Sequence, residues 1–406
     1  MTLKNSKYQW TWFSIVALGI FSYDGSLGML LPVVPLFLKQ LDLSEAFLGL
    51  PLLVFGIGWL FGSLLFAYLM RIYNQRKIFL IVAFTVLIGC GLSTAFLVSL
   101  SQFLIMLFLQ GMAEGLVWQM GLLTISEIFT DAQQAVANGY LFASFNFATI
   151  IAPVISSFIF NAYQTAGFGT VMCILGGIGL VGSIILPEKL EMHTVSHPDS
   201  LTWKQMKHPA YISGLLLAFM SAGIRTAFET LISIILRDRF DVPNEFIGLY
   251  YLNISVPATI ASLFMGHLSV RISEYKLIWL GISFCLISTF IILFSTSIIF
   301  TCFGLMCLSI GFVFTSSPIP SFLCKLLKTH PSSLHGSFNF FTAFGIAVYP
   351  LISGAIISNS GNVWTCVFLV ASILVIVPPM ILTYKYTKTI DLSSLESLES
   401  LTLNEI

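Results

Sequence analysis

Four ionisable side chains lie deep inside long apolar stretches of this sequence: Asp24, Glu114, Arg225 and Glu229. Each is roughly 12–20 residues from the start of its stretch, near the bilayer centre if that stretch is a membrane-spanning helix. An ion at that depth costs at least a few kcal/mol, so it must face a cavity or a partner. Carboxyl groups in such places can take up and release protons as water leaves and enters, and an arginine can bind an anion.

Each of these residues also has a structural interpretation. Asp24 is flanked by serines and a glycine, so its carboxyl group could couple protons, bind substrate or simply accept hydrogen bonds. The same alternatives hold for Glu114. Arg225 and Glu229 are four residues apart, on one helical face, and could satisfy each other; alternatively, Arg225 faces a cavity. Four ionised groups would carry two net negative charges, which favours a cationic substrate or protons and leaves room for a zwitterion.

Further candidates accompany Glu114 on the same stretch, where Gln110, Trp118 and Gln119 could line a cavity. Metal and cofactor chemistry has little support. The seven cysteines form no CxxC pair, and the histidines of the central loop suit a solvated linker better than a zinc site. No nucleophile–histidine–acid set or nucleotide-binding loop is visible, so we expect neither an enzyme nor a cofactor. A net charge of zero gives no indication of nucleic-acid binding.

The composition predicts that these ionisable residues belong to a membrane protein. Hydrophobic residues make up 57% of the chain and charged residues 9%, with a mean hydropathy of +0.95. A soluble domain has roughly a quarter charged residues. The apolar runs continue for about 20 residues, long enough to cross a bilayer as helices. We therefore expect an all-α membrane protein.

Twelve spans are predicted, most joined by short connections. They cover residues 12–38, 46–70, 78–98, 102–126, 136–160, 168–187, 209–236, 245–270, 277–297, 299–324, 336–358 and 363–384. The polar stretch 188–208 separates six spans from six. The expected organisation is an N-terminal six-helix bundle (1–187), a linker (188–208), a C-terminal six-helix bundle (209–385) and a tail (386–406).

The distribution of lysine and arginine predicts the orientation in the membrane. With a cytoplasmic N-terminus, fourteen of the 18 cations fall on the inner side, three on the outer side, and Arg225 is inside a span. Short loops with such a bias face the cytoplasm. We expect a multi-pass protein of the cell's inner membrane with both termini and the central linker in the cytoplasm.

The two halves of the chain share a pattern of helix breaks. Gly139 precedes Pro153 by fourteen residues, and Gly336 precedes Pro350 by the same interval. Small residues surround both prolines. Corresponding interrupted helices in two halves of a membrane protein are typical of secondary transporters built from repeats.

Several segments resemble motifs of the major facilitator superfamily, and the resemblance covers essentially the whole chain. Residues 67–77 align with the loop motif G-x-L-x-D-R-x-G-R-R, and residues 266–271 give a second, partial copy. Residues 107–111 are similar to R-x-x-Q-G, with leucine in place of the arginine. Residues 148–157 resemble the antiporter motif G-x-x-x-G-P-x-x-G-G with small residues replacing the glycines.

This resemblance implies twelve helices in two six-helix bundles related by a pseudo-two-fold axis, with spans 1, 4, 7 and 10 lining a central cavity. Arg71 and Arg271 stand where the family's loops help to close the cytoplasmic side, but the acidic position of that motif is absent here. Either these arginines meet helix C-termini or they serve as membrane anchors. We assign Gly139, Pro153, Gly336, Pro350 and both arginines to gating and helix breaks.

The expected function is proton-coupled export of a small amphiphilic solute (a drug, metabolite or siderophore-like compound) by alternating access. The alternative is proton symport or facilitated uptake of a nutrient such as an amino acid, sugar or organic ion. The expected partners are a small-molecule substrate, protons and the lipid bilayer, with the chain acting as a monomer.

Overall fold

The computed structural model describes residues 3–32, 34, 47, 49–72, 76–97, 99–129, 131–185, 203–320, 322–323 and 331–360. Across these residues the regular structure is helical. The helices are α1 (Leu3–Leu30), α3 (Gly49–Ile72), α4 (Arg76–Ala95), α5 (Leu100–Ile128), α6 (Asp131–Ile185), α7 (Trp203–Met206), α8 (Pro209–Phe240), α9 (Asn244–Tyr250), α10 (Leu252–Arg271), α11 (Glu274–Phe294), α12 (Ile298–Ser316) and α14 (Pro331–Ser360).

Eleven segments of the described chain are long and apolar enough to cross a membrane, and they match the first eleven predicted spans. Large apolar side chains such as Phe264, Phe294 and Ile299 are exposed around the outside, as expected of helices that face lipid. The predicted span at 363–384, the tail at 386–406 and linker residues 188–202 lie outside the described residues. The prediction of a helical, multi-pass membrane protein is confirmed.

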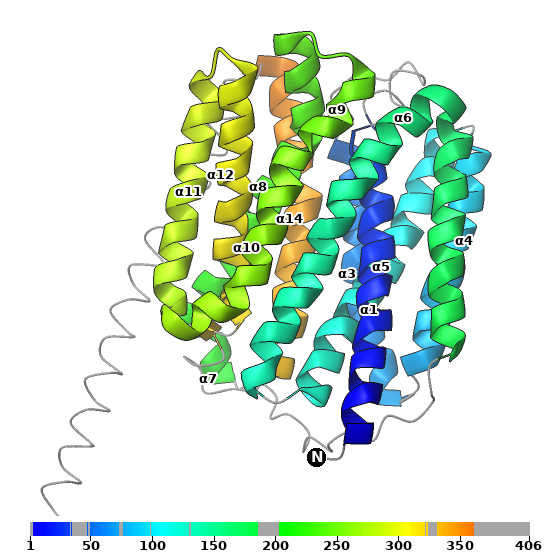
Figure 1. Cartoon of the computed structure of the whole chain (residues 1–406), viewed down its shortest axis with the longest axis vertical. Coiled ribbons are helices and arrows are strands. Elements are labelled where there is room, and N and C mark those ends of the chain that lie inside the picture. The colour runs from blue at the N-terminus through cyan, green and yellow to red at the C-terminus, as the bar shows by residue number, and fades with distance from the viewer. Residues whose placement is uncertain are drawn as a thin grey trace, which may run out of the picture.

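Two predicted spans, 136–160 and 168–187, belong to one helix, because helical structure continues from Asp131 to Ile185. Figure 1 shows that α6 turns back at the top of the molecule, so its two arms still cross in opposite directions. The span predicted at 245–270 is instead divided into α9 and α10 at Tyr251. The first difference arises because the 160–168 connection has no proline, and Gly167 is its only residue with a strong preference against helix.

Glycines bring α3 and α5 into backbone contact. A β-carbon added at Gly62 of α3 would lie 1.8 Å from the Met112 carbonyl oxygen, and one at Gly111 of α5 would lie 2.1 Å from that of Phe55. Small residues permit this approach between helices in a membrane. The contact fixes α5, which carries Glu114, against α3.

The halves of the chain, residues 3–185 and 203–360, meet at the end where α6 turns back. There Gly248 of α9 packs on Pro153 of α6, with its N–H donating to Ser157 Oγ at 3.0 Å. Gly49 of α3 packs against Pro350 and Leu351 of α14 in the same way. Each proline of the repeated break is thus covered by a glycine from the opposite half.

Candidate functional site

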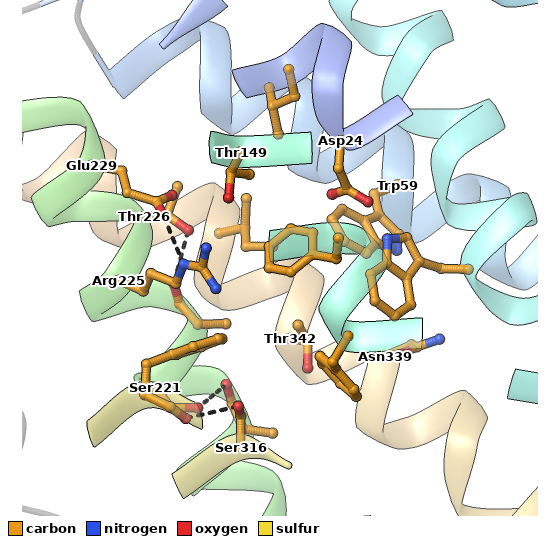
Figure 2. A pocket seen from close by; sticks show the side chains of 18 of the residues that line it. Asp24, Trp59, Thr149, Ser221, Arg225, Thr226, Glu229, Ser316, Asn339 and Thr342 are labelled. Atoms are coloured by element: carbon orange, nitrogen blue, oxygen red, sulfur yellow. Dashed lines mark hydrogen bonds and ion pairs between the residues drawn. The ribbon is translucent and has the colours of Figure 1, made fainter. Parts of the chain in front are cut away.

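A cavity lies between the two halves, with about 860 Å³ of empty space when the part open to solvent is included. It is lined from many helices, and Figure 2 shows the polar side chains that face it. Asp24 comes from α1, Trp59 from α3, Arg225 from α8 and Asn339 from α14. Most of the remaining lining is aromatic or aliphatic, which suits an organic ligand.

Asp24 is held in the middle of α1, with 2% of its surface exposed. The serines beside it do not bind its carboxyl group, because Ser22 Oγ donates to the Leu18 carbonyl and Ser26 Oγ to the Tyr23 carbonyl. Asp24 Oδ2 has no hydrogen-bond partner among the described residues. The carboxyl group is therefore buried at the cavity wall with much of its hydrogen-bonding capacity unused.

Glu114 lies behind Asp24 rather than on the cavity wall of the described chain. Its side chain is fully buried, and neither carboxyl oxygen has a hydrogen-bond partner among the described residues. The carboxyl groups of Glu114 and Asp24 are close enough to interact electrostatically. We call these two carboxyl groups the acidic pair. Arg225 is near enough to act on Asp24, but two charged carboxylates side by side in an apolar interior are not stable, so the pair must hold a proton or gain a cationic partner.

Trp59 and Trp118 form an aromatic wall beside this acidic pair. Their rings stack with centroids 6.3 Å apart and planes 21° apart, and both line the cavity. Phe142 and Phe145 of α6 pack against Trp118 at 5.6 and 5.9 Å. Aromatic faces next to carboxyl groups favour a cationic, flat or apolar ligand group.

Arg225 combines the two interpretations that its sequence left open. Its Nε donates to Glu229 Oε1 at 2.6 Å, the intrahelical pair, and its side chain also lines the cavity. Nη1 donates to Asn146 Oδ1 of α6 at 3.2 Å. The guanidinium carbon lies 4.6 Å from the Phe145 ring centre and 4.5 Å from that of Phe312. Arg225 is thereby held between helices of both halves.

Glu229 is anchored in turn by Tyr251, whose hydroxyl donates to the Glu229 backbone carbonyl. Asn146 extends the network further, since its Nδ2 donates to Ser262 Oγ of α10 at 2.9 Å. The polar chain from Arg225 through Asn146 to Ser262 therefore crosses from the C-terminal half to the N-terminal half and back.

The other cavity candidates differ in placement. Trp118 lines the cavity, whereas the described lining includes neither Gln110 nor Gln119. Gln110 Nε2 donates to Ser26 Oγ at 2.7 Å and so ties α5 to α1. Gln119 is buried, one residue beyond Trp118 and thus on another side of α5.

The candidates for gating and helix breaks are spread over four helices. Gly139 and Pro153 are buried in α6, and Pro350 is buried in α14. Gly336 is exposed, and a β-carbon there would meet nothing within 4 Å. Arg271 is exposed in the last turn of α10. Arg71 lies in the last turn of α3, and its side chain lies outside the described parts of the structure.

Sequence reasoning did not single out Phe312, Thr342 or Asn339 as part of this lining, although Asn339 was noticeable as an amide inside an apolar span. Their contribution depends on how the C-terminal helices rotate toward the cavity. The described residues contain no group of three or more histidine, cysteine or acidic side chains that could hold a metal ion.

The chain is similar to known proteins over most of its length. Residues 16–347 match the model of the Major Facilitator Superfamily. The chain is 25% identical over 374 residues to multidrug resistance protein 2 of Bacillus subtilis, covering 86% of this chain and 90% of that protein. It is 24% identical over 356 residues to the quinolone resistance protein NorA of Staphylococcus aureus, covering 84% and 89%.

The fold also agrees with solved structures. A structure of the nucleoside transporter NupG superposes with a TM-score of 0.70 at 12% identity, covering 91% of this chain and 98% of that one. The match of the family model over most of the chain, the helical membrane fold and the cavity between two halves all agree. The chain belongs to the major facilitator superfamily of membrane transporters.

Proposed function

We propose that this protein exports a small amphiphilic organic solute in exchange for protons, by alternating access across the inner membrane. The observation that carries the proposal is the acidic pair Asp24–Glu114, buried beside a cavity walled by two tryptophans. The names of the relatives, a multidrug resistance protein and a quinolone resistance protein, support efflux of drug-like compounds.

The coupling follows from the cost of burying charge. When the cavity is closed to water, the acidic pair must hold protons or contact a cationic ligand, because bare carboxylates are not stable in an apolar interior. When water enters, the protons can leave. Protons and a cationic ligand thus compete for one pair of carboxyl groups, which is the requirement for exchange.

In this proposal the N-terminal bundle (1–187) and the C-terminal bundle (209–385) rock about the cavity, with both termini in the cytoplasm. Bending at Pro153 and Pro350 accompanies the motion, since each proline lies where the halves touch. The transported molecule and protons are the ligands, and no enzymatic step is part of the proposal.

The test uses everted membrane vesicles and the cationic dye ethidium. An exporter of this kind accumulates ethidium when the vesicle interior is acidic. One unit of pH difference stores about 1.4 kcal/mol per proton, enough for about tenfold accumulation per proton exchanged. Asp24→Asn and Glu114→Gln keep the side-chain size but cannot titrate. We expect at least one of them to abolish gradient-driven accumulation while ethidium binding to the purified protein remains measurable.

The matched control is Asp238→Asn, which removes an exposed carboxylate paired with Arg237 at the end of α8 and should leave accumulation unchanged. Gradient-driven accumulation that persists in the Asp24→Asn/Glu114→Gln double variant would remove both residues from the mechanism. Wild-type vesicles that instead lose ethidium on interior acidification would reverse the direction of transport.

A further inference from the structure

Arg225 lines the cavity and has one hydrogen-bonding nitrogen that is unused. Its Nε is occupied by Glu229 and its Nη1 by Asn146. Its Nη2 has no partner among the described residues, although the residue is only 4% exposed and lines the cavity. The rings of Phe145 and Phe312 hold the guanidinium in place. A fixed, buried donor without an acceptor destabilises the empty cavity, so a ligand that supplies an acceptor binds more tightly.

A second unused donor belongs to the same cavity. The Asn339 side chain on α14 is 4% exposed, and its Nδ2 also lacks a partner among the described residues. Asn339 and Arg225 are both among the residues that line the cavity. In Figure 2 Arg225 and Glu229 lie on one side of the view, Asp24 and Trp59 on the other, and Asn339 lies below Trp59.

The cavity therefore has an acidic side and a basic side, near enough to each other for Arg225 to act electrostatically on Asp24. One side has the carboxyl group of Asp24, with Glu114 behind it, and the stacked indoles of Trp59 and Trp118. The other side has the unused Arg225 Nη2, which stays a strong donor even while Glu229 binds the neighbouring Nε. A purely cationic ligand would satisfy the acidic side and leave Arg225 Nη2 without an acceptor.

We propose that the preferred ligand is a zwitterionic aromatic amphiphile. Its cationic group lies against the Asp24 carboxyl group and the two tryptophans, and its carboxylate accepts a hydrogen bond from Arg225 Nη2. A polar substituent near the tryptophans can accept from Asn339 Nδ2. This inference rests on the proposed function, because it names the class of substrate for the same cavity. Glu229 limits the gain by repelling the carboxylate, so discrimination between matched ligands is expected to be about tenfold.

The test compares two fluorescent dyes that differ by one methyl ester. Rhodamine 110 has a free carboxylate and is zwitterionic, whereas rhodamine 123 is the ester and a net cation. Binding to the purified full-length protein in lipid nanodiscs is measured by equilibrium dialysis at neutral pH. We expect wild type to bind rhodamine 110 about tenfold more tightly than rhodamine 123.

Two variants examine the donors. Asn339→Asp adds a negative charge to the cavity lining below Trp59, so the preference should shift toward the cationic ester. The Arg225→Gln/Glu229→Gln double variant removes both charges without stranding either and should bring the two affinities within about twofold. Asn253→Asp is the matched control, because Asn253 lies on α10 outside the cavity lining and donates to the Tyr250 carbonyl. It should keep the wild-type ratio.

Equal binding of the two dyes by wild type, or failure to bind either, overturns the inference. So does a preference that survives in both donor variants. These outcomes are separate from the fate of the proposed function, which is decided by ethidium accumulation under a proton gradient. An exporter that accumulates ethidium but ignores the carboxylate would refute the zwitterion site alone.

Discussion

Gly248 and Pro153 offer the sharpest test of how the two halves separate. A β-carbon at Gly248 would lie 2.2 Å from the Pro153 carbonyl oxygen and 2.4 Å from Ser157 Oγ. Carbon and oxygen atoms rarely approach closer than about 3.4 Å without strain, so Gly248→Ala requires the two backbones to move apart by about 1 Å. In the proposed alternating-access cycle this contact exists only while this end is closed, so the strain would fall on that state alone.

The size of the effect follows from the cost of overpacking. An added methyl group in a well-packed contact costs about 1–3 kcal/mol. At 1.4 kcal/mol for each factor of ten, the ratio of closed to open molecules at this end should fall by about 5- to 150-fold. The helix-forming advantage of alanine over glycine applies equally to both states and cancels. Gly49→Ala should act in the same direction, since its β-carbon would lie 2.2 Å from Leu351 Cα.

The assay is a distance measurement by electron paramagnetic resonance. Spin labels at Tyr163, where α6 turns back, and at Thr296, between α11 and α12, report the separation of the halves in a cysteine-free background. Both residues are exposed, and Figure 1 shows the turn of α6 and the α11–α12 connection at the same end of the molecule. We expect the Gly248→Ala distribution to shift to longer distances and transport to slow. Gly177→Ala is the control, because a β-carbon there meets nothing within 4 Å. An unchanged distribution in both Gly248→Ala and Gly49→Ala would refute the reasoning.

Two further predictions concern topology and the buried ion pair. A reporter active only in the cytoplasm should work when fused after Ser200 and fail when fused after Val242; activity at Val242 would contradict the predicted orientation. Arg225→Ala strands Glu229 without a partner, which costs about 3–5 kcal/mol, so the folded yield by fluorescence-detected size exclusion should drop. Adding Glu229→Ala should restore the yield, and a single variant that expresses normally would show that the pair is not structural.

The helices and the four deep ionisable residues could be predicted because their signals are local. A continuous apolar run predicts a membrane-spanning helix. A charged residue within such a run is conspicuous, because burying a charge in the membrane is energetically costly. Asp24, Arg225 and Glu229 line one cavity, and Glu114 lies directly behind Asp24. The depth of each residue along its helix was therefore enough to predict that these residues lie near one another.

Helix rotation could not be predicted. Gln119 and Trp118 are neighbours in sequence, yet the described lining of the cavity includes Trp118 and does not include Gln119. A helix that is apolar all round has no amphipathic face to fix its rotation. Phe312 and Asn339 were missed for a related reason, because their place in the cavity lining depends on contacts between distant helices.

The glycine contacts between α3 and α5 have a consequence for how the cavity changes shape. Gly58, Gly62, Gly111 and Gly115 leave so little room that neither helix can slide along the other without a clash. Trp59 and Trp118 therefore move together, because the α3–α5 pair that carries them is one rigid unit. Arg225 belongs to a second unit, built on α8. A bulky ligand is accommodated by a change in the distance between these two units rather than by a change within either one, so the thickness of a ligand, more than the shape of its perimeter, should decide which conformation it favours.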